Sequence, residues 1–193
     1  TASHNPQIWN GLKFLNPNGT FLDGKQIKQV IRWSKSSFFS YAGIKEIKPV
    51  TSDYSWIHKH IDKVLKLKSV KVNAIRKRKF KVVVDAVNSS GSFIVPLLLQ
   101  KLGCKVIELF CDGSGVFPHA PEPLPQNLKQ LCTAVKKNNA DLVISVDPDS
   151  DRLVIITEKG EPFIEENTIT TVIRCVFRNV KSNIKIATVN LST

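Results

Sequence analysis

The sequence reads Phe80-Lys81-Val82-Val83-Val84-Asp85 and then, two residues later, Asn88-Ser89-Ser90-Gly91-Ser92. The first segment has the composition of a buried strand, and the polar turn after it suits the N-terminus of a helix. An apolar stretch from Phe93 to Leu102 predicts that helix, and Gly103 is a typical helix stop. Lys105 to Phe110 predicts the next strand. This order of strand, helix and strand indicates a parallel pairing covered by a helix.

Further elements are predicted on both sides of this unit. Downstream we expect a helix from Pro125 or Gln126 through Asn139, strands at 140–146 and 154–157, a helix at 167–180 and a strand at 184–189. Upstream we expect a short strand at 12–15, a helix from Asp23 or Gly24 through Ile31, a helix at 54–67, and a Lys-rich junction at 66–79 that contains a short helix. The expected fold class is therefore α/β, with mixed, mostly parallel sheets flanked by helices.

Composition excludes several classes of protein. The chain has 193 residues, 42% of them hydrophobic, which is enough to bury a core and too apolar for a disordered polycation. No apolar run approaches the length of a membrane span, and the start Thr1-Ala2-Ser3-His4 has no signal-peptide pattern, so a cytoplasmic location is expected. The absence of Met predicts a processed start or a piece of a longer protein. The four scattered cysteines predict free structural thiols.

Positive charge is concentrated in the first part of the chain. Residues 1–82 carry a net charge of +13 and residues 83–193 a net charge of −1. A basic nucleic-acid-binding module over residues 66–81 is therefore one interpretation. However, 22 of the 28 basic residues are Lys, and no aromatic residues alternate with them as a stacking platform requires. We therefore favour a solvated basic face and do not expect nucleic acid as a partner.

Three aspartates alternate in Asp147-Pro148-Asp149-Ser150-Asp151-Arg152, directly after the strand predicted at 140–146. Ligand sites of α/β proteins gather at such strand ends, and carboxylates this close repel one another unless a cation lies between them. Hard oxygen ligands of this kind suit Mg²⁺. An EF-hand is excluded, because its sixth position must be Gly and is Arg152 here. A solvated acidic turn stays open as the alternative for this segment taken alone.

A second group of polar residues lies at the start of the chain, in Thr1-Ala2-Ser3-His4-Asn5-Pro6 followed by Asn10-Gly11-Leu12-Lys13. The segment is rich in turn residues, so the Ser3 hydroxyl is a candidate for nucleophilic attack or phosphorylation. His4 and Lys13 would place positive charge beside it, which suits phosphate oxygens. The Gly-x-Ser-x-Gly pattern of a hydrolase elbow is absent. For Ser-His-Asn-Pro taken alone, an ordinary turn is an equally good interpretation.

Taken together and in this order, the two segments closely resemble the α-D-phosphohexomutase family, which includes phosphoglucomutase, phosphomannomutase and phosphoglucosamine mutase. The segment around Ser3 resembles the phosphoserine loop of the family, and residues 147–152 resemble its metal-binding loop. Pro121-Glu122-Pro123 with Asn127-Leu128 resembles the segment that precedes that loop. The chain is most similar to bacterial members of the phosphoglucomutase/phosphomannomutase type.

The resemblance implies a Mg²⁺-dependent isomerase that interconverts hexose 1-phosphates and hexose 6-phosphates through a phosphoserine and a bisphosphate intermediate. A hexose 1,6-bisphosphate would be the activator. Ser3 would be the phosphoserine, His4 and Lys13 would be candidates for proton transfer and for holding the attacking hydroxyl, and Arg152 would help to position the phosphoryl group. Mg²⁺ would be held by an oxygen of phospho-Ser3 and by three carboxylates, those of Asp147, Asp149 and Asp151.

The resemblance also implies a domain organisation. Residues 1–68 would be the C-terminal part of domain 1, residues 72–182 domain 2, and residues 183–193 the start of domain 3. The sugar-recognition loop of domain 3 and the phosphate-binding loop of domain 4 would lie outside the sequence, so glucose, mannose and glucosamine phosphates all stay open as substrates, as does the oligomeric state. We expect this chain alone to bind Mg²⁺ without mutase turnover. A non-catalytic metal-binding domain is the other interpretation.

Overall fold

A five-stranded mixed sheet forms the centre of the molecule, in the strand order β2-β1-β3-β4-β5. The computed structural model describes residues 3–36, 39–122, 124–163 and 165–178. The strands are β1 (Lys81–Asp85), β2 (Lys105–Phe110), β3 (Leu142–Val146), β4 (Leu153–Thr157) and β5 (Pro162–Phe163). Strand β1 pairs in parallel with β2 and β3, whereas β4 runs antiparallel to β3 and β5. The predicted mixed α/β class and its central strand–helix–strand unit are therefore confirmed.

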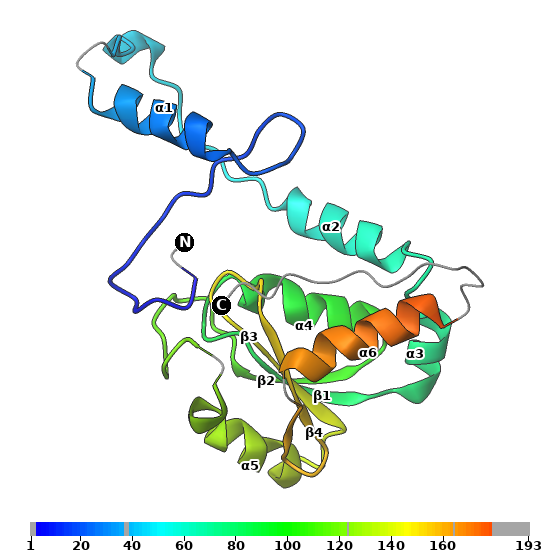
Figure 1. Ribbon diagram of the computed structural model, residues 1–193. Coiled ribbons are helices and arrows are strands. Elements are labelled where there is room, and N and C mark those ends of the chain that lie inside the picture. The colour runs from blue at the N-terminus through cyan, green and yellow to red at the C-terminus, as the bar shows by residue number, and fades with distance from the viewer. Residues whose placement is uncertain (1–2, 37–38, 123, 164, 179–193) are drawn as a thin grey trace.

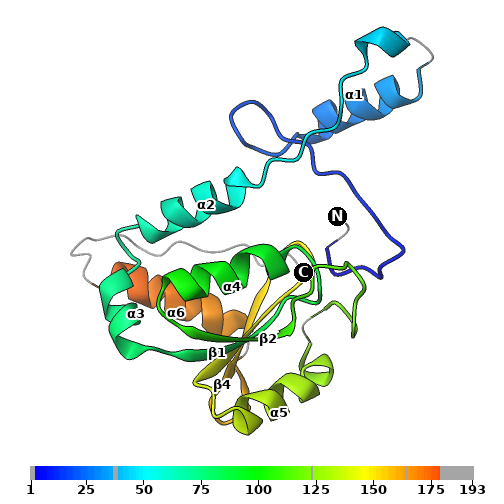
Figure 2. The same cartoon turned by 180° about the vertical axis from the view of Figure 1, so that it is seen from behind.

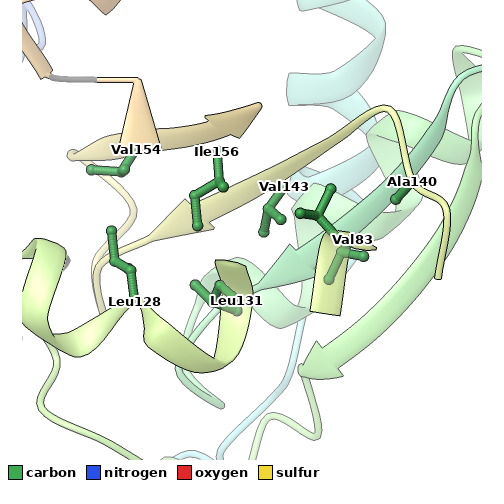
Figure 3. Packing of buried hydrophobic residues seen from close by; sticks show 8 residues of the cluster. Val83, Leu128, Leu131, Ala140, Val143, Val154 and Ile156 are labelled. Atoms are coloured by element: carbon green, nitrogen blue, oxygen red, sulfur yellow. The ribbon is translucent and has the colours of Figure 1, made fainter. Parts of the chain in front are cut away.

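Helices cover both faces of this sheet (Figures 1 and 2). Helices α4 (Gly91–Lys101) and α6 (Glu165–Phe177) lie on one face, and α5 (Lys129–Lys137) lies on the other. Successive side chains of a strand point to opposite faces of the sheet, so β1 can pack against helices on both faces. Val82 and Val84 pack with Leu99 of α4, while Val83 joins Leu131 of α5 in a second cluster (Figure 3). Each of these valines is at most 2% exposed, so β1 is the most deeply buried strand end to end.

The first part of the chain extends away from the sheet (Figure 1). Helix α1 (Gly24–Ser34) begins at Asp23, whose side chain accepts hydrogen bonds from the backbone of residues 25 and 26 in a capping box. No residue of α1 is buried. A short 3₁₀ helix (Ile44–Glu46) follows, then α2 (Ser55–Leu65), which contacts α4, and α3 (Val72–Arg78), which leads into β1. Ile61 is the one buried residue of α2.

Several local predictions need correction. The strand expected at 12–15 is wrong, because within the described residues Leu15 makes only an isolated bridge to Phe21, across a turn at 16–20. The helix expected from residue 125 to 139 is split into a 3₁₀ turn (Pro125–Asn127) and α5. Helix α6 begins two residues earlier than expected, and β5 was not predicted. The strand expected at 184–189 and the segment assigned to domain 3 (183–193) lie outside the described residues.

Two predictions from composition can be compared with the structure. All four cysteines are free, as expected. None of the helices in the described ranges combines the length and apolar character that crossing a bilayer would need.

Candidate functional site

The segment 147–152, called the acidic loop below, connects β3 to β4. It lies at the end of the sheet where the parallel strands β1 and β3 have their carboxyl ends. Asp147 follows β3 directly and is fully buried, and the loop turns back through Ser150, whose φ of +62° lies in the left-handed region. The backbone N–H of Ser150 donates to the carbonyl of Asp147 at 3.0 Å, which closes the turn. The geometry brings one carboxylate oxygen from each of Asp147, Asp149 and Asp151 within 4.8 Å of the others. The structure thus gathers the three predicted carboxylates into one cluster.

Ser3 reaches this cluster from the far end of the sequence. Its hydroxyl donates to Asp147 Oδ2 at 2.8 Å, across a separation of 144 residues, and lies 3.5 Å from His4 Nδ1. The other oxygen of Asp147, Oδ1, accepts from the backbone N–H groups of Asp151 and Arg152, each at 3.1 Å. Asp147 therefore has a fixed orientation, set by its own loop on one oxygen and by Ser3 on the other. Figure 1 shows the segment after the N-terminus lying beside the loops at this end of the sheet.

Lys13 supplies a positive charge to the same cluster. Its ammonium group forms a salt bridge with Asp149 Oδ2 and a second one, at 3.4 Å, with Asp151 Oδ2. The Asp149 side chain is 8% exposed, whereas Lys13 and Asp151 are 46% and 58% exposed. The lysine thus neutralises part of the carboxylate charge from the solvent side.

These contacts shift the pKa values of neighbouring carboxyl groups in opposite directions. Burial raises the pKa of Asp147, against the opposing effect of its hydrogen bonds from Arg152 and Ser3. Burial also acts to raise the pKa of Asp149, but the Lys13 hydrogen bond and charge outweigh it, and the pKa of Asp149 is lowered. The hydrogen bond to Asp149 in turn raises the pKa of Lys13, so the lysine stays protonated at neutral pH. The cluster thus holds a cationic side chain beside an ionised, largely buried carboxylate.

The cluster meets the chemical requirements of a divalent cation. Asp149 Oδ1 is buried and has no hydrogen-bond partner among the described residues, which is costly for a carboxylate oxygen unless another group completes its environment. Hard oxygen donors are the ligands that Mg²⁺ prefers, and one or two carboxylates with phosphate oxygens are its usual set. The donor set and the unpartnered oxygen of Asp149 therefore fit Mg²⁺, with Ser3 placed to contribute an oxygen beside Asp147.

Arg152, also singled out in the sequence, lies at the end of the acidic loop. Its NH1 group lies 3.3 Å from Glu122 Oε1, and both side chains are about one-third exposed. Glu122 belongs to the Pro-Glu-Pro segment noted before the loop, so the structure joins that segment to the cluster. All the residues predicted for the site thus lie on or beside the acidic loop.

A second buried polar group lies nearby and was missed by sequence reasoning. Asp85, at the end of β1, is fully buried and accepts hydrogen bonds from Ser145 Oγ at 3.2 Å and from the backbone N–H of Val87 at 2.9 Å. His119 Nε2 lies 3.0 Å from the same carboxylate, and this hydrogen bond raises the pKa of His119. The sequence signal was an aspartate that ends an otherwise apolar strand. Ser145 lies on β3 and His119 on a distant loop, so neither side-chain partner could be identified from spacing.

The basic junction before β1 makes structural contacts. Arg76 donates through Nε and NH2 to the carbonyl of Lys101 at 3.1 and 2.9 Å, and the Arg78 guanidinium lies 5.2 Å from the centre of the Phe80 ring. Arg76 thus ties α3 to the end of α4, and Arg78 lies over the residue that precedes β1. Two side chains of the basic run that was expected to be a solvated face therefore make contacts within the fold.

Comparison with protein families gives a match over the sheet region. The family model described as "Phosphoglucomutase/phosphomannomutase, alpha/beta/alpha domain II" matches residues 58–160. This range contains β1 to β4, α3 to α5 and the acidic loop.

Individual relatives extend this match to the N-terminal part. A phosphoglucomutase/phosphomannomutase of Thermococcus kodakarensis is 36% identical over the whole chain, which covers 42% of that protein. A phosphoglucosamine mutase of Methanococcus maripaludis is 34% identical over 83% of the chain and 36% of that protein. A crystal structure of a phosphoglucomutase/phosphomannomutase family protein from Burkholderia thailandensis matches 92% of the chain with a TM-score of 0.73 and 28% identity, over 37% of its own length. The chain thus spans less than half the length of these relatives.

Proposed function

Because the chain belongs to the phosphoglucomutase and phosphomannomutase family, we propose that it forms part of a Mg²⁺-dependent phosphohexomutase that interconverts hexose 1-phosphates and hexose 6-phosphates. The substrate class is a glucose, mannose or glucosamine phosphate, with a hexose 1,6-bisphosphate as activator, and the location is the cytoplasm. Since the chain spans 42% of its full-length relative, the complete cycle is assigned to the whole protein, and the chain alone is expected to show no turnover. Residues 1–68 and 72–182 are assigned to domains 1 and 2.

The observation that carries this proposal is the hydrogen bond from Ser3 Oγ to Asp147 Oδ2 at 2.8 Å. It supports Ser3 as the phosphorylated residue, because a phosphoryl group on this oxygen would lie beside the carboxylate cluster. When bound there, Mg²⁺ would neutralise negative charge on the phosphoryl group, and Asp147, Asp149 and Asp151 would hold it together with Ser3. The buried oxygen of Asp149, which has no hydrogen-bond partner among the described residues, supports the fit of these donors to Mg²⁺.

The residues of the chain account for the remaining tasks of phosphoryl transfer. The hydroxyl oxygen of the sugar forms a bond to phosphorus as the bond between phosphorus and Ser3 Oγ breaks, and the proton of that hydroxyl passes to a base. His4, 3.5 Å from Ser3 Oγ, is the candidate for this proton. Lys13, whose ammonium group contacts Asp149 and Asp151, is a further candidate for proton transfer and for holding the attacking hydroxyl. Arg152, at the other end of the loop, is the proposed contact for phosphoryl oxygens.

Phosphate mapping tests the proposal. After incubation of the protein with Mg²⁺ and glucose 1,6-bisphosphate, intact mass and peptide mapping are expected to place one phosphate on Ser3. Ser3→Ala should abolish this phosphate, and Ser3→Ala in the whole protein should reduce mutase activity by about 10³-fold or more. Ser36→Ala is the matched control, because in the part of the chain that the structure describes the Ser36 hydroxyl donates to the carbonyl of Trp33 in its own turn. Full activity in Ser3→Ala would refute the assignment of the nucleophile.

A further inference from the structure

The turn between β1 and α4 contacts the acidic loop through one backbone carbonyl. Ser90 Oγ donates to the carbonyl of Pro148 at 2.7 Å and Ser89 Oγ at 2.9 Å, and the backbone N–H of Ser90 donates to the same oxygen at 3.3 Å. Ser90 Oγ also lies 3.2 Å from Ser150 Oγ. Pro148 stands between the first two carboxylates of the cluster, so three donors converge on the centre of the acidic loop.

The hydroxyl of Ser90 donates to the acidic loop and makes no hydrogen bond with the first turn of α4. Ser90 is the N-cap residue of α4, a position where a serine side chain normally accepts a hydrogen bond from the first turn of the helix. Here the side chain makes no capping bond, and it donates to the acidic loop instead. Ser90 has helical φ and ψ of −58° and −33°, whereas a capping residue is usually extended, so its hydroxyl is available to the acidic loop and not to the helix.

The backbone around the two serines is constrained on both sides. Val87 and Asn88, just before them, have φ of +46° and +55°, and a left-handed conformation is rare for a β-branched residue such as valine. Such conformations persist only where the surroundings fix them, and the N–H of Asn88 is held by the carbonyl of Phe110 at 2.9 Å. Just after the serines, a Cβ on Gly91 would meet Val146 Cγ2 at 2.6 Å, so only glycine lets the turn lie this close to the end of β3.

We infer that Ser89 and Ser90 are positioning residues that fix Asp149 for a divalent cation. The carbonyl of Pro148 belongs to the same planar peptide unit as the N–H of Asp149, so donors that hold this oxygen also fix the direction in which Asp149 leaves the backbone. Asp149 in turn carries the buried oxygen without a hydrogen-bond partner. Residues that orient metal ligands in this indirect way contribute substantially to metal affinity. The inference rests on the proposed function, because it assigns the cluster to a metal ion.

Metal titration of the 193-residue chain tests this inference. Mn²⁺ binding is followed by electron paramagnetic resonance, and Mg²⁺ by calorimetry, so neither readout depends on enzyme activity. Ser89→Ala/Ser90→Ala is expected to weaken binding by about 10-fold or more, and each single variant by less. Ser90→Thr keeps a hydroxyl at an exposed position and should restore most of the affinity. Ser92→Ala is the control, because Ser92 lies in the first turn of α4 and its Oγ has no hydrogen-bond partner within the described ranges. The metal affinity of this variant should stay within about twofold of the wild-type value.

The outcomes separate this inference from the proposed function. Wild-type affinity in the double variant, or an equal loss in Ser92→Ala, would overturn the positioning role while leaving the metal site intact. Absence of binding in the wild type, or binding unaffected by Asp149→Asn, would refute the metal site itself and the inference with it. Circular dichroism in EDTA checks that each variant is folded. Should the double variant not fold, the single variants and Ser90→Thr decide the question by the same criteria.

Discussion

Lys13 occupies the side from which a divalent cation would approach the carboxylates. Removing the lysine charge should therefore raise the affinity for the cation. The ammonium group contacts Asp149 Oδ2 and Asp151 Oδ2, so a metal ion that uses these oxygens must displace the lysine or share them with it. Lys13→Gln keeps most of the side-chain length and removes the charge. We therefore expect this variant to bind Mg²⁺ more tightly than the wild type.

The expected magnitude follows from exposure. Lys13 and Asp151 are about half exposed, so their ion pair is screened by solvent and contributes at most a few tenths of a kcal/mol. The contact with the largely buried Asp149 is stronger but is still made from the solvent side by a half-exposed lysine, so about 1 kcal/mol in total is a reasonable value. This corresponds to an increase in Mg²⁺ affinity of about fivefold.

Calorimetric titration at constant ionic strength measures this change. Lys25→Gln on α1 is the matched control, because it removes the same charge from a helix on which no residue is buried and which stands away from the cluster. Its affinity for Mg²⁺ should stay close to that of the wild type. If Lys13→Gln binds Mg²⁺ no more tightly than Lys25→Gln does, the lysine and the metal ion do not compete for the same oxygens, and the reasoning is wrong.

Two further predictions concern stability and exposure. The hydrogen bond to Asp85 raises the pKa of His119 in the folded state, so protonated His119 stabilises the fold. This contribution to the free energy of unfolding is complete below the unfolded-state pKa of the histidine and is lost as pH rises through its folded-state pKa. The free energy of unfolding, measured by urea titration in EDTA, should therefore fall from about pH 6.5 upward. His119→Gln should flatten this part of the pH profile. Equal slopes in the two proteins would contradict the role of the His119–Asp85 pair. The three tryptophans are more than half exposed and all lie in residues 1–68, namely Trp9, Trp33 and Trp56. Their fluorescence should resemble that of free tryptophan and be readily quenched by acrylamide, whereas a blue shift with rising protein concentration would show that another copy covers them.

The elements that could be predicted from sequence are those whose signal is local. Val82 to Val84 form an uninterrupted apolar run because the strand is buried on both faces, and Gly103, with φ of +77°, ends its helix as expected. The three aspartates could be recognised because they share one short loop. The prediction of a strand at 12–15 was wrong because a strand needs a partner strand, which no local signal reveals. In the described structure this segment has only the bridge at Leu15.

Contacts between distant segments could not be predicted in this way. Asp85 and His119 are 34 residues apart, and the bond from Ser89 to Pro148 spans 59 residues. Each depends on how neighbouring loops pack at the end of the sheet, and spacing along the chain carries no signal for it. The polar turn at 88–92 could be identified as a helix start, but the direction of its hydroxyls towards the acidic loop required the structure.

The hydrogen bond between Ser3 and Asp147 also has a consequence for biosynthesis. Its two partners are 144 residues apart, and a ribosome that adds about 5–20 residues per second needs roughly 7–30 seconds to proceed from one to the other. Asp147 leaves the ribosome only after the three segments that form the parallel part of the sheet have been made. The serine segment can therefore dock only after these strands have been made, so assembly of the site follows synthesis of the parallel part of the sheet.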